Sequence, residues 1–126
     1  MTPKTMKRLA GTAGVAVGLA SVIAGARVLL GFSQPAYTVI PLLVLYNVVM
    51  GAVALLAGAG LWGNRAWAPK LAGVIALCHL AVLGLLLLAK FMGESIAAES
   101  VGAMTFRSAA WSAIALLARR AEQRPT

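Results

Sequence analysis

Four long apolar stretches, separated by short polar segments, dominate the pattern of this chain. They cover residues 9–31, 37–62, 70–91 and 95–118. A helix crosses the hydrocarbon core of a bilayer with about 20 mostly apolar residues, because each residue adds about 1.5 Å. The pattern therefore predicts four transmembrane helices. The fourth stretch is the most polar, and we expect neighbouring helices to shelter its polar residues: Glu99, Ser100, Thr105, Arg107 and Ser108.

The connections between these stretches are short and fall at residues 31–35, 63–69 and 92–94. Short connections make consecutive helices antiparallel neighbours. We therefore expect an all-α fold in which residues 1–126 form one integral membrane four-helix bundle with antiparallel up-down topology. Pro41 lacks the N–H group that a helix interior requires, so it either opens the second helix or kinks it.

Composition also favours a membrane environment. Hydrophobic residues make up 61% of the 126 residues and charged residues only 11%, whereas soluble domains carry about 25% charge. A domain this small has too much surface for its volume to bury so many apolar side chains in water. Lipid is therefore the expected solvent. The lone cysteine, Cys78, excludes an intrachain disulfide and a dithiol redox centre within one chain.

Positive charge is concentrated outside the apolar stretches. Eight of the eleven basic residues lie before the first helix, in the second connection or after the fourth helix: Lys4, Lys7, Arg8, Arg65, Lys70, Arg119, Arg120 and Arg124. Four spans place these regions on one side, and an excess of Lys and Arg marks the cytoplasmic side. We expect a multi-pass protein of a bacterial-type inner membrane with both termini cytoplasmic. The net charge of +8 indicates topology and not nucleic-acid binding, because no basic stripe organises it.

The first apolar stretch has a second interpretation. Basic residues 4–8, the apolar run and the small residues Ala24–Ala26 are typical of a signal peptide with its cleavage site. Cleavage would leave three spans. Apolar sequence resumes at residues 28–30, however, and the stretch is long enough to cross the membrane, so we prefer the interpretation with four spans.

Small residues recur at helical spacing on two predicted helices. Those of the first helix, spaced three or four residues apart on one face, are Gly11, Gly14, Gly18, Ser21 and Gly25. Those of the second helix are Gly51, Ala54 and Gly58. Small residues allow helices in lipid to approach closely, so these faces predict packing within the bundle. Homodimerisation through the first helix and a glycine-lined permeation path are the alternatives.

Polar residues on three different helices are predicted to share one layer of the membrane. Asn47, His79 and Arg107 lie ten to twelve residues from the outer ends of their helices. At about 1.5 Å per residue, all three are roughly 15–18 Å deep, near the midplane. Tyr46 is adjacent to Asn47, and Trp111 follows Arg107 by one helical turn, where its ring can cover the guanidinium through a cation–π contact.

Each of these candidate ligand-binding residues also has a structural interpretation. Asn47 can join helices through hydrogen bonds. His79 can be a hydrogen-bonded structural histidine or, in a symmetric dimer, a haem ligand. Arg107 can bind an anionic headgroup, a quinone carbonyl or a substrate anion, or it can pair with protein carbonyls or a partner subunit. The sequence indicates no catalytic residue and no metal site, and it does not identify a cofactor.

A second polar set is expected nearer the outer surface. Arg27 lies late in the first helix and Glu99 early in the fourth, so the two can form an ion pair across the bundle. Glu99 can instead complement the positive end of the helix dipole, and the long side chain of Arg27 can extend outward to the interface.

One segment resembles a known family. Residues 46–62 begin with Tyr46-Asn47 and Gly51, continue with an aliphatic run and end in Gly58-Ala59-Gly60-Leu61-Trp62, followed by the basic turn at Arg65. This order is similar to the second helix of DoxX-like membrane proteins. The resemblance implies a four-helix bundle that is linked in some members to quinone or sulfur redox chemistry. Members often carry an acidic residue where Tyr46-Asn47 stands, and this chain does not.

Three functional hypotheses follow, none of which requires an enzyme. The first is an accessory or assembly subunit, or a DoxX-like protein associated with membrane redox chemistry, in a homo-oligomer or a larger membrane complex. The second is a small-molecule binder or transporter that uses the layer of Asn47, His79 and Arg107 as its site. The third is an electron carrier that binds haem or quinone through His79.

Overall fold

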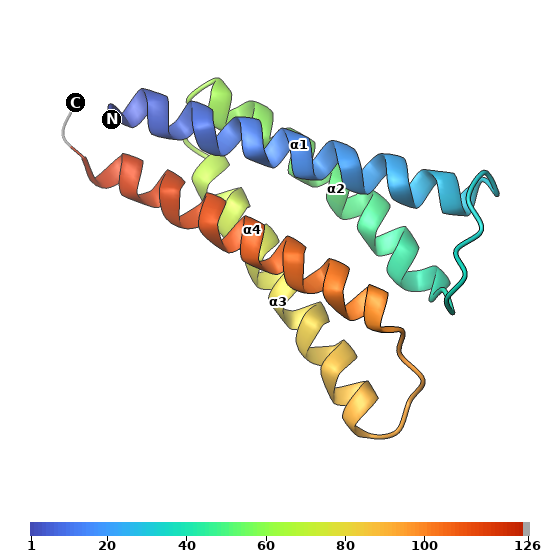
Figure 1. Ribbon diagram of the computed structural model, residues 1–126. Helices are drawn as coiled ribbons and strands as arrows, with labels where there is room; N and C mark the ends of the chain where they lie inside the picture. The colour runs from blue at the N-terminus through green and yellow to red at the C-terminus, as the bar shows by residue number, and fades with distance from the viewer. Residues whose placement is uncertain (125–126) are drawn as a thin grey trace.

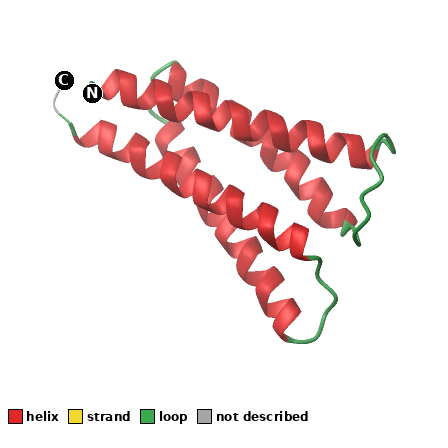
Figure 2. Ribbon diagram, in the orientation of Figure 1, coloured by secondary structure: helices red, strands yellow, loops and turns green. Residues whose placement is uncertain are grey.

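The computed structural model describes residues 1–124, which form four helices and no strand (Figures 1 and 2). The helices are α1 (Pro3–Leu29), α2 (Pro41–Trp62), α3 (Ala68–Phe91) and α4 (Ala98–Gln123). All four are long and apolar enough to cross a membrane. The expected all-α class is confirmed, and the arrangement is consistent with a four-helix bundle in a multi-pass membrane protein.

The helices form two hairpins that meet at one end of the molecule. Figure 1 shows α1 beside α2 and α4 beside α3, with both chain ends and the α2–α3 connection at the same end. Hydrogen bonds tie this end together: Arg124 Nη1 donates to the Met1 carbonyl oxygen over 3.0 Å, and Lys7 Nζ donates to Asn64 Oδ1 over 2.8 Å. At the other end the two hairpins diverge (Figure 1).

Prolines and a cap explain where the helices begin. Thr2 caps α1 by accepting a hydrogen bond from the Thr5 N–H over 3.2 Å, so the helix starts six residues before the expected Leu9. Pro41 opens α2 and does not kink it, since the first helical position has no partner for an N–H group. α4 begins at Ala98, three residues later than expected, and continues to Gln123.

The small-residue face of α1 packs against α2 at backbone distance. Gly11, Gly14, Gly18, Ser21 and Gly25 are all buried. A Cβ atom on Gly18 would lie 2.9 Å from the carbonyl oxygen of Gly51, and one on Gly11 would lie 2.7 Å from that of Gly58. Because no side chain fits between the helices at these points, their backbones are in direct contact. Only small residues permit this spacing.

The core lies in the half of the bundle near the chain ends. Trp111 of α4 is its largest member and is fully buried. Its Cη2 atom occupies the space beside Gly14, 3.0 Å from where a Cβ atom would be. Leu61 of α2 and Ile75 of α3 complete the contacts between helices. Outward faces carry many exposed leucines, which suits a lipid surrounding.

Adding one methyl group to the contact between α1 and α2 tests this packing. In Gly58→Ala the new Cβ would lie 2.7 Å from the Val15 nitrogen and 2.8 Å from the Gly11 oxygen, both backbone atoms. We expect a loss of about 1–3 kcal/mol in the free energy of unfolding, because the helices must separate. Circular dichroism during thermal unfolding in detergent micelles measures the loss.

Gly84→Ala is the matched control, since its Cβ would meet no atom within 4 Å. Alanine is the better helix former, so this variant should be as stable as the parent protein or more stable. Equal stability of the two variants would contradict direct backbone packing between α1 and α2.

Candidate functional site

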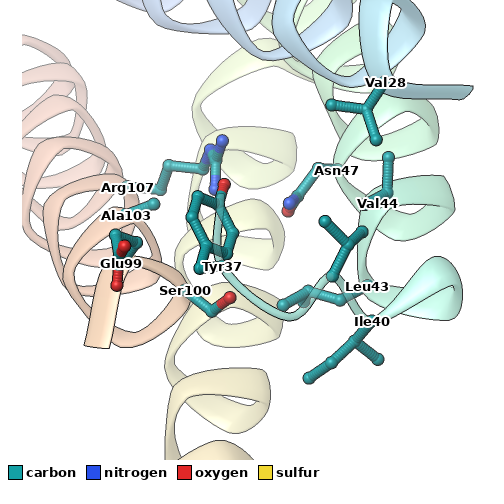
Figure 3. A pocket seen from close by; sticks show the side chains of 11 residues that line it. Val28, Tyr37, Ile40, Leu43, Val44, Asn47, Glu99, Ser100, Ala103 and Arg107 are labelled. Carbon is teal, nitrogen blue, oxygen red and sulfur yellow. The ribbon is translucent and has the colours of Figure 1, made fainter. Parts of the chain in front are cut away.

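A cavity of about 80 Å³ lies where the hairpins diverge, between α2, α4, the end of α1 and the α1–α2 connection (Figure 3). Its polar side chains come from the connection, from α2 and from α4: Tyr37, Asn47, Glu99, Ser100 and Arg107. Aliphatic side chains form the rest of its wall: Val28, Val39, Ile40, Leu43, Val44 and Ala103. The cavity therefore combines several hydrogen-bonding groups with an apolar lining.

Arg107 projects from α4 toward the small-residue face of α1. Its Nε atom donates to Ser21 Oγ over 3.1 Å, while the same hydroxyl donates to the Val17 carbonyl oxygen over 2.9 Å. Figure 3 shows the guanidinium beside the Tyr37 hydroxyl. Within residues 1–124, no carboxylate forms an ion pair with Arg107. Its remaining N–H donors are thus free for a ligand.

Asn47 directs its side-chain amide into the cavity from the opposite wall (Figure 3). Its Oδ1 atom is buried and has no hydrogen-bond partner in the described part of the chain. A buried polar atom without a partner costs about 1–3 kcal/mol. A bound molecule that donates a hydrogen bond to Oδ1 would remove this cost. Asn47 therefore does not join helices through a hydrogen bond to Oδ1, as one interpretation of the sequence had it.

Tyr46 and His79 form a separate pair beside the cavity. The Tyr46 hydroxyl and His79 Nδ1 lie 2.9 Å apart in a hydrogen bond between α2 and α3. The two rings meet edge to face, with centroids 5.7 Å apart. His79 is only 2% exposed. Tyr46 and Asn47 are consecutive residues on a helix, so their side chains point in different directions. The polar layer expected near the midplane therefore consists of two separate groups: the Tyr46–His79 pair, and Asn47 with Arg107 at the cavity.

The expected cation–π contact between Trp111 and Arg107 does not form in the described part of the chain. Trp111 turns instead toward Gly14 of α1, because this glycine leaves room for a large ring in the core. The cation–π contact that the structure does contain places the Arg8 guanidinium 4.9 Å from the centroid of the Trp62 ring, near the chain ends.

Arg27 and Glu99 are likewise not brought together as an ion pair. Arg27 is exposed in the last turn of α1, and Glu99 is exposed in the first turn of α4, where it borders the cavity. The divergence of the hairpins separates these two helix ends (Figure 1). Glu99 therefore contributes its charge to the cavity and not to a contact with α1.

Sequence reasoning missed two residues of the cavity, Tyr37 and Ser100. Tyr37 was expected to begin the second helix, but residues 30–40 form a connection that carries its ring back to the cavity. Ser100 was expected to be sheltered by neighbouring helices, without a particular site. Its spacing of seven residues from Arg107 predicts that both lie on one face of α4, but that shared face alone did not mark Ser100 as a ligand-binding residue.

Comparison with models of protein families, with curated proteins and with solved structures finds no match for this chain. Its function is therefore inferred from the geometry of its own residues. Among residues 1–124, no group of three or more His, Cys, Asp and Glu side chains could hold a metal ion. The polar cavity around Arg107 and Asn47 is the site with the clearest chemistry.

Replacing Asn47 distinguishes a ligand-binding residue from a structural one. In Asn47→Leu the unpaired Oδ1 atom disappears, so we expect an unchanged or higher unfolding temperature in detergent. Tyr46→Phe is the comparison, since it removes the hydroxyl that bonds His79. Hydrogen bonds between membrane helices contribute about 0.6 kcal/mol on average, so this variant should unfold at a lower temperature. A clear loss of stability in Asn47→Leu would show that Asn47 is structural.

Proposed function

We propose that this protein binds the head of a quinone within the membrane and serves as an accessory protein of membrane redox chemistry. The supporting observation is that the N–H donors of Arg107 and the unpaired acceptor Oδ1 of Asn47 face one cavity. A buried cation is costly in lipid unless acceptor oxygens surround it. The carbonyl oxygen of a quinone can accept a hydrogen bond from the Arg107 guanidinium, and the hydroxyl group of the reduced form, a quinol, can donate one to Asn47 Oδ1.

The charge of the cavity favours a neutral ligand over a free anion. Glu99 borders the same cavity as Arg107, so their two formal charges cancel. The aliphatic wall of the cavity also suits a ring with apolar substituents. Its volume of about 80 Å³ is below the 300–1,000 Å³ typical of pockets that enclose a drug-sized molecule. It is also below the roughly 150 Å³ of a cavity that holds benzene, so the cavity can receive only the carbonyl edge of a head group, with the rest of the molecule in lipid.

Two other features support a binding and accessory role. The connections between the helices are short, so almost no soluble portion is present within residues 1–124 for independent chemistry. The similarity of residues 46–62 to DoxX-like proteins agrees with a link to quinone chemistry. A transport role is less favoured, because Trp111 and its neighbours fill the bundle between the cavity and the chain ends.

Haem binding through His79 is also less favoured. Its Nδ1 atom is engaged with Tyr46, and the ring is 2% exposed. An iron ligand needs a ring nitrogen with open space before it, so haem would have to displace the surrounding core. The cavity at Arg107 requires no such rearrangement.

Removing the charge of Arg107 tests quinone binding. The probe is a ubiquinone with a single isoprene unit, titrated into the purified protein in detergent and followed by calorimetry. We expect Arg107→Gln to weaken binding about tenfold or more, since a hydrogen bond to a charged donor contributes about 1.5–3 kcal/mol. Arg27→Gln, which changes an exposed arginine of α1, is the control and should bind like the parent protein.

Two outcomes would contradict the proposal. Equal binding by the parent protein and Arg107→Gln would place the quinone elsewhere. Tighter binding of benzoate, a smaller aromatic anion with one six-membered ring, would identify an anion site instead. Native mass spectrometry of the protein released from its own membrane would then show which molecule or partner subunit accompanies it.

We further propose an up-down bundle in a bacterial-type inner membrane with both termini in the cytoplasm. Both chain ends and the α2–α3 connection lie at one end of the molecule in Figure 1. Eight of the eleven basic residues of the chain belong to these segments and the helix ends next to them. Trp62 and Trp67 lie at the same end, as expected of aromatic residues at an interface.

Reporter fusions in a bacterial host test this orientation. Alkaline phosphatase is active only outside the cytoplasm, so we expect activity when it is fused after Gly93, in the α3–α4 connection. Fused to the C-terminus, it should be inactive, while green fluorescent protein should fluoresce there. The reverse pattern would contradict cytoplasmic termini.

A further inference from the structure

A second hollow, of about 430 Å³, lies on the outer surface of the bundle between α3 and α4. Lys70, in the first turn of α3, and Arg119, in the last part of α4, stand at its polar end together with Glu122. This end is the one that carries the chain termini (Figure 1). The hollow is therefore a groove that begins at the membrane surface and continues toward the interior.

The deeper part of the groove is apolar and open. Val74, Leu77 and Leu116 line it, and their side chains are 53%, 68% and 59% exposed. At Gly73 an added Cβ atom would meet nothing within 4 Å, so no neighbouring helix covers this position. In a membrane the groove is filled by lipid or by another protein.

The charges at the mouth favour an anionic occupant. Lys70 and Arg119 are both exposed, and no ion pair engages either of them among the described residues. With Glu122 the mouth has a formal charge of +1, which matches the single negative charge of a phosphodiester. A helix from a second copy in the same orientation would bring its own basic end to this place, so like charges oppose that occupant.

We propose that the groove binds one anionic phospholipid. Its phosphate lies between the ammonium group of Lys70 and the guanidinium of Arg119, and an acyl chain lies along Gly73, Leu77 and Leu116. Basic pockets between helices at the cytoplasmic surface bind lipid head groups through this combination of charge and apolar surface. The proposal is independent of quinone binding, because the groove and the cavity share no residue.

Lipid titration with matched charge variants tests the proposal. Phosphatidylglycerol is added to the full-length protein in detergent, and the bound lipid is counted by native mass spectrometry. Each basic residue near a lipid surface contributes about 1 kcal/mol. We therefore expect Lys70→Gln with Arg119→Gln to weaken binding about 30-fold. Neutral phosphatidylcholine should bind weakly to every variant.

The control is Lys4→Gln with Arg65→Gln, which removes the same charge from the same end of the molecule but outside the groove. We expect less than a threefold effect. An equal loss in both double variants would overturn the proposal, because attraction would then depend on total charge and not on the groove.

Gly73→Leu tests the apolar part without changing the charge. A leucine at this open position fills the groove and should weaken phosphatidylglycerol binding, while thermal unfolding stays unchanged. If Gly73→Leu instead converts a dimer of the parent protein into a monomer without altering lipid binding, the occupant is a second copy of the chain and the lipid proposal fails.

Discussion

Backbone contact between α1 and α2 determines where the other side chains can go. A Cβ atom on Gly18 would lie 2.9 Å from the Gly51 carbonyl oxygen, so the two helices are as close as their backbones allow. In lipid, where apolar side chains gain nothing by leaving water, such contact is a main source of association. The same glycine face leaves room at Gly14 for Trp111, which brings α4 onto α1. The row of small residues on α1 thus contacts both α2 of its own hairpin and α4 of the other.

The cavity depends on this arrangement through Ser21. Ser21 belongs to the small-residue face of α1, and its hydroxyl accepts the hydrogen bond from Arg107. One helix face therefore serves two purposes: glycines hold α2, and the serine orients the guanidinium of α4. Beyond this point the hairpins diverge, so the guanidinium and the Asn47 amide meet a cavity and not a packed core (Figure 3). The face of α1 that packs against α2 therefore also positions Arg107 at the cavity.

Local patterns in the sequence were sufficient to predict the helices and their apolar character, because length and composition decide both. The sequence also predicted the position of the small-residue face, since helical spacing alone defines it. Contacts between side chains of different helices could not be predicted from these local patterns. Arg107 bonds Ser21 and not Trp111, and Tyr37 returns to the cavity from a connection. Both depend on the angle between the hairpins, which no spacing within one helix encodes.

Among residues 1–124, three buried side-chain polar atoms have no hydrogen-bond partner, and they differ in whether a ligand could reach them. Ser108 Oγ and Trp111 Nε1 belong to the packed half of α4, where Trp111 is fully buried within the core. Asn47 Oδ1 differs because its side chain lines a cavity, beside a guanidinium with free donors. A ligand can satisfy a buried polar atom only where the ligand can enter. Of these three residues, Asn47 is therefore the candidate for ligand binding. An unpaired amide oxygen that lines a cavity together with an arginine is what distinguishes this site from the packed core.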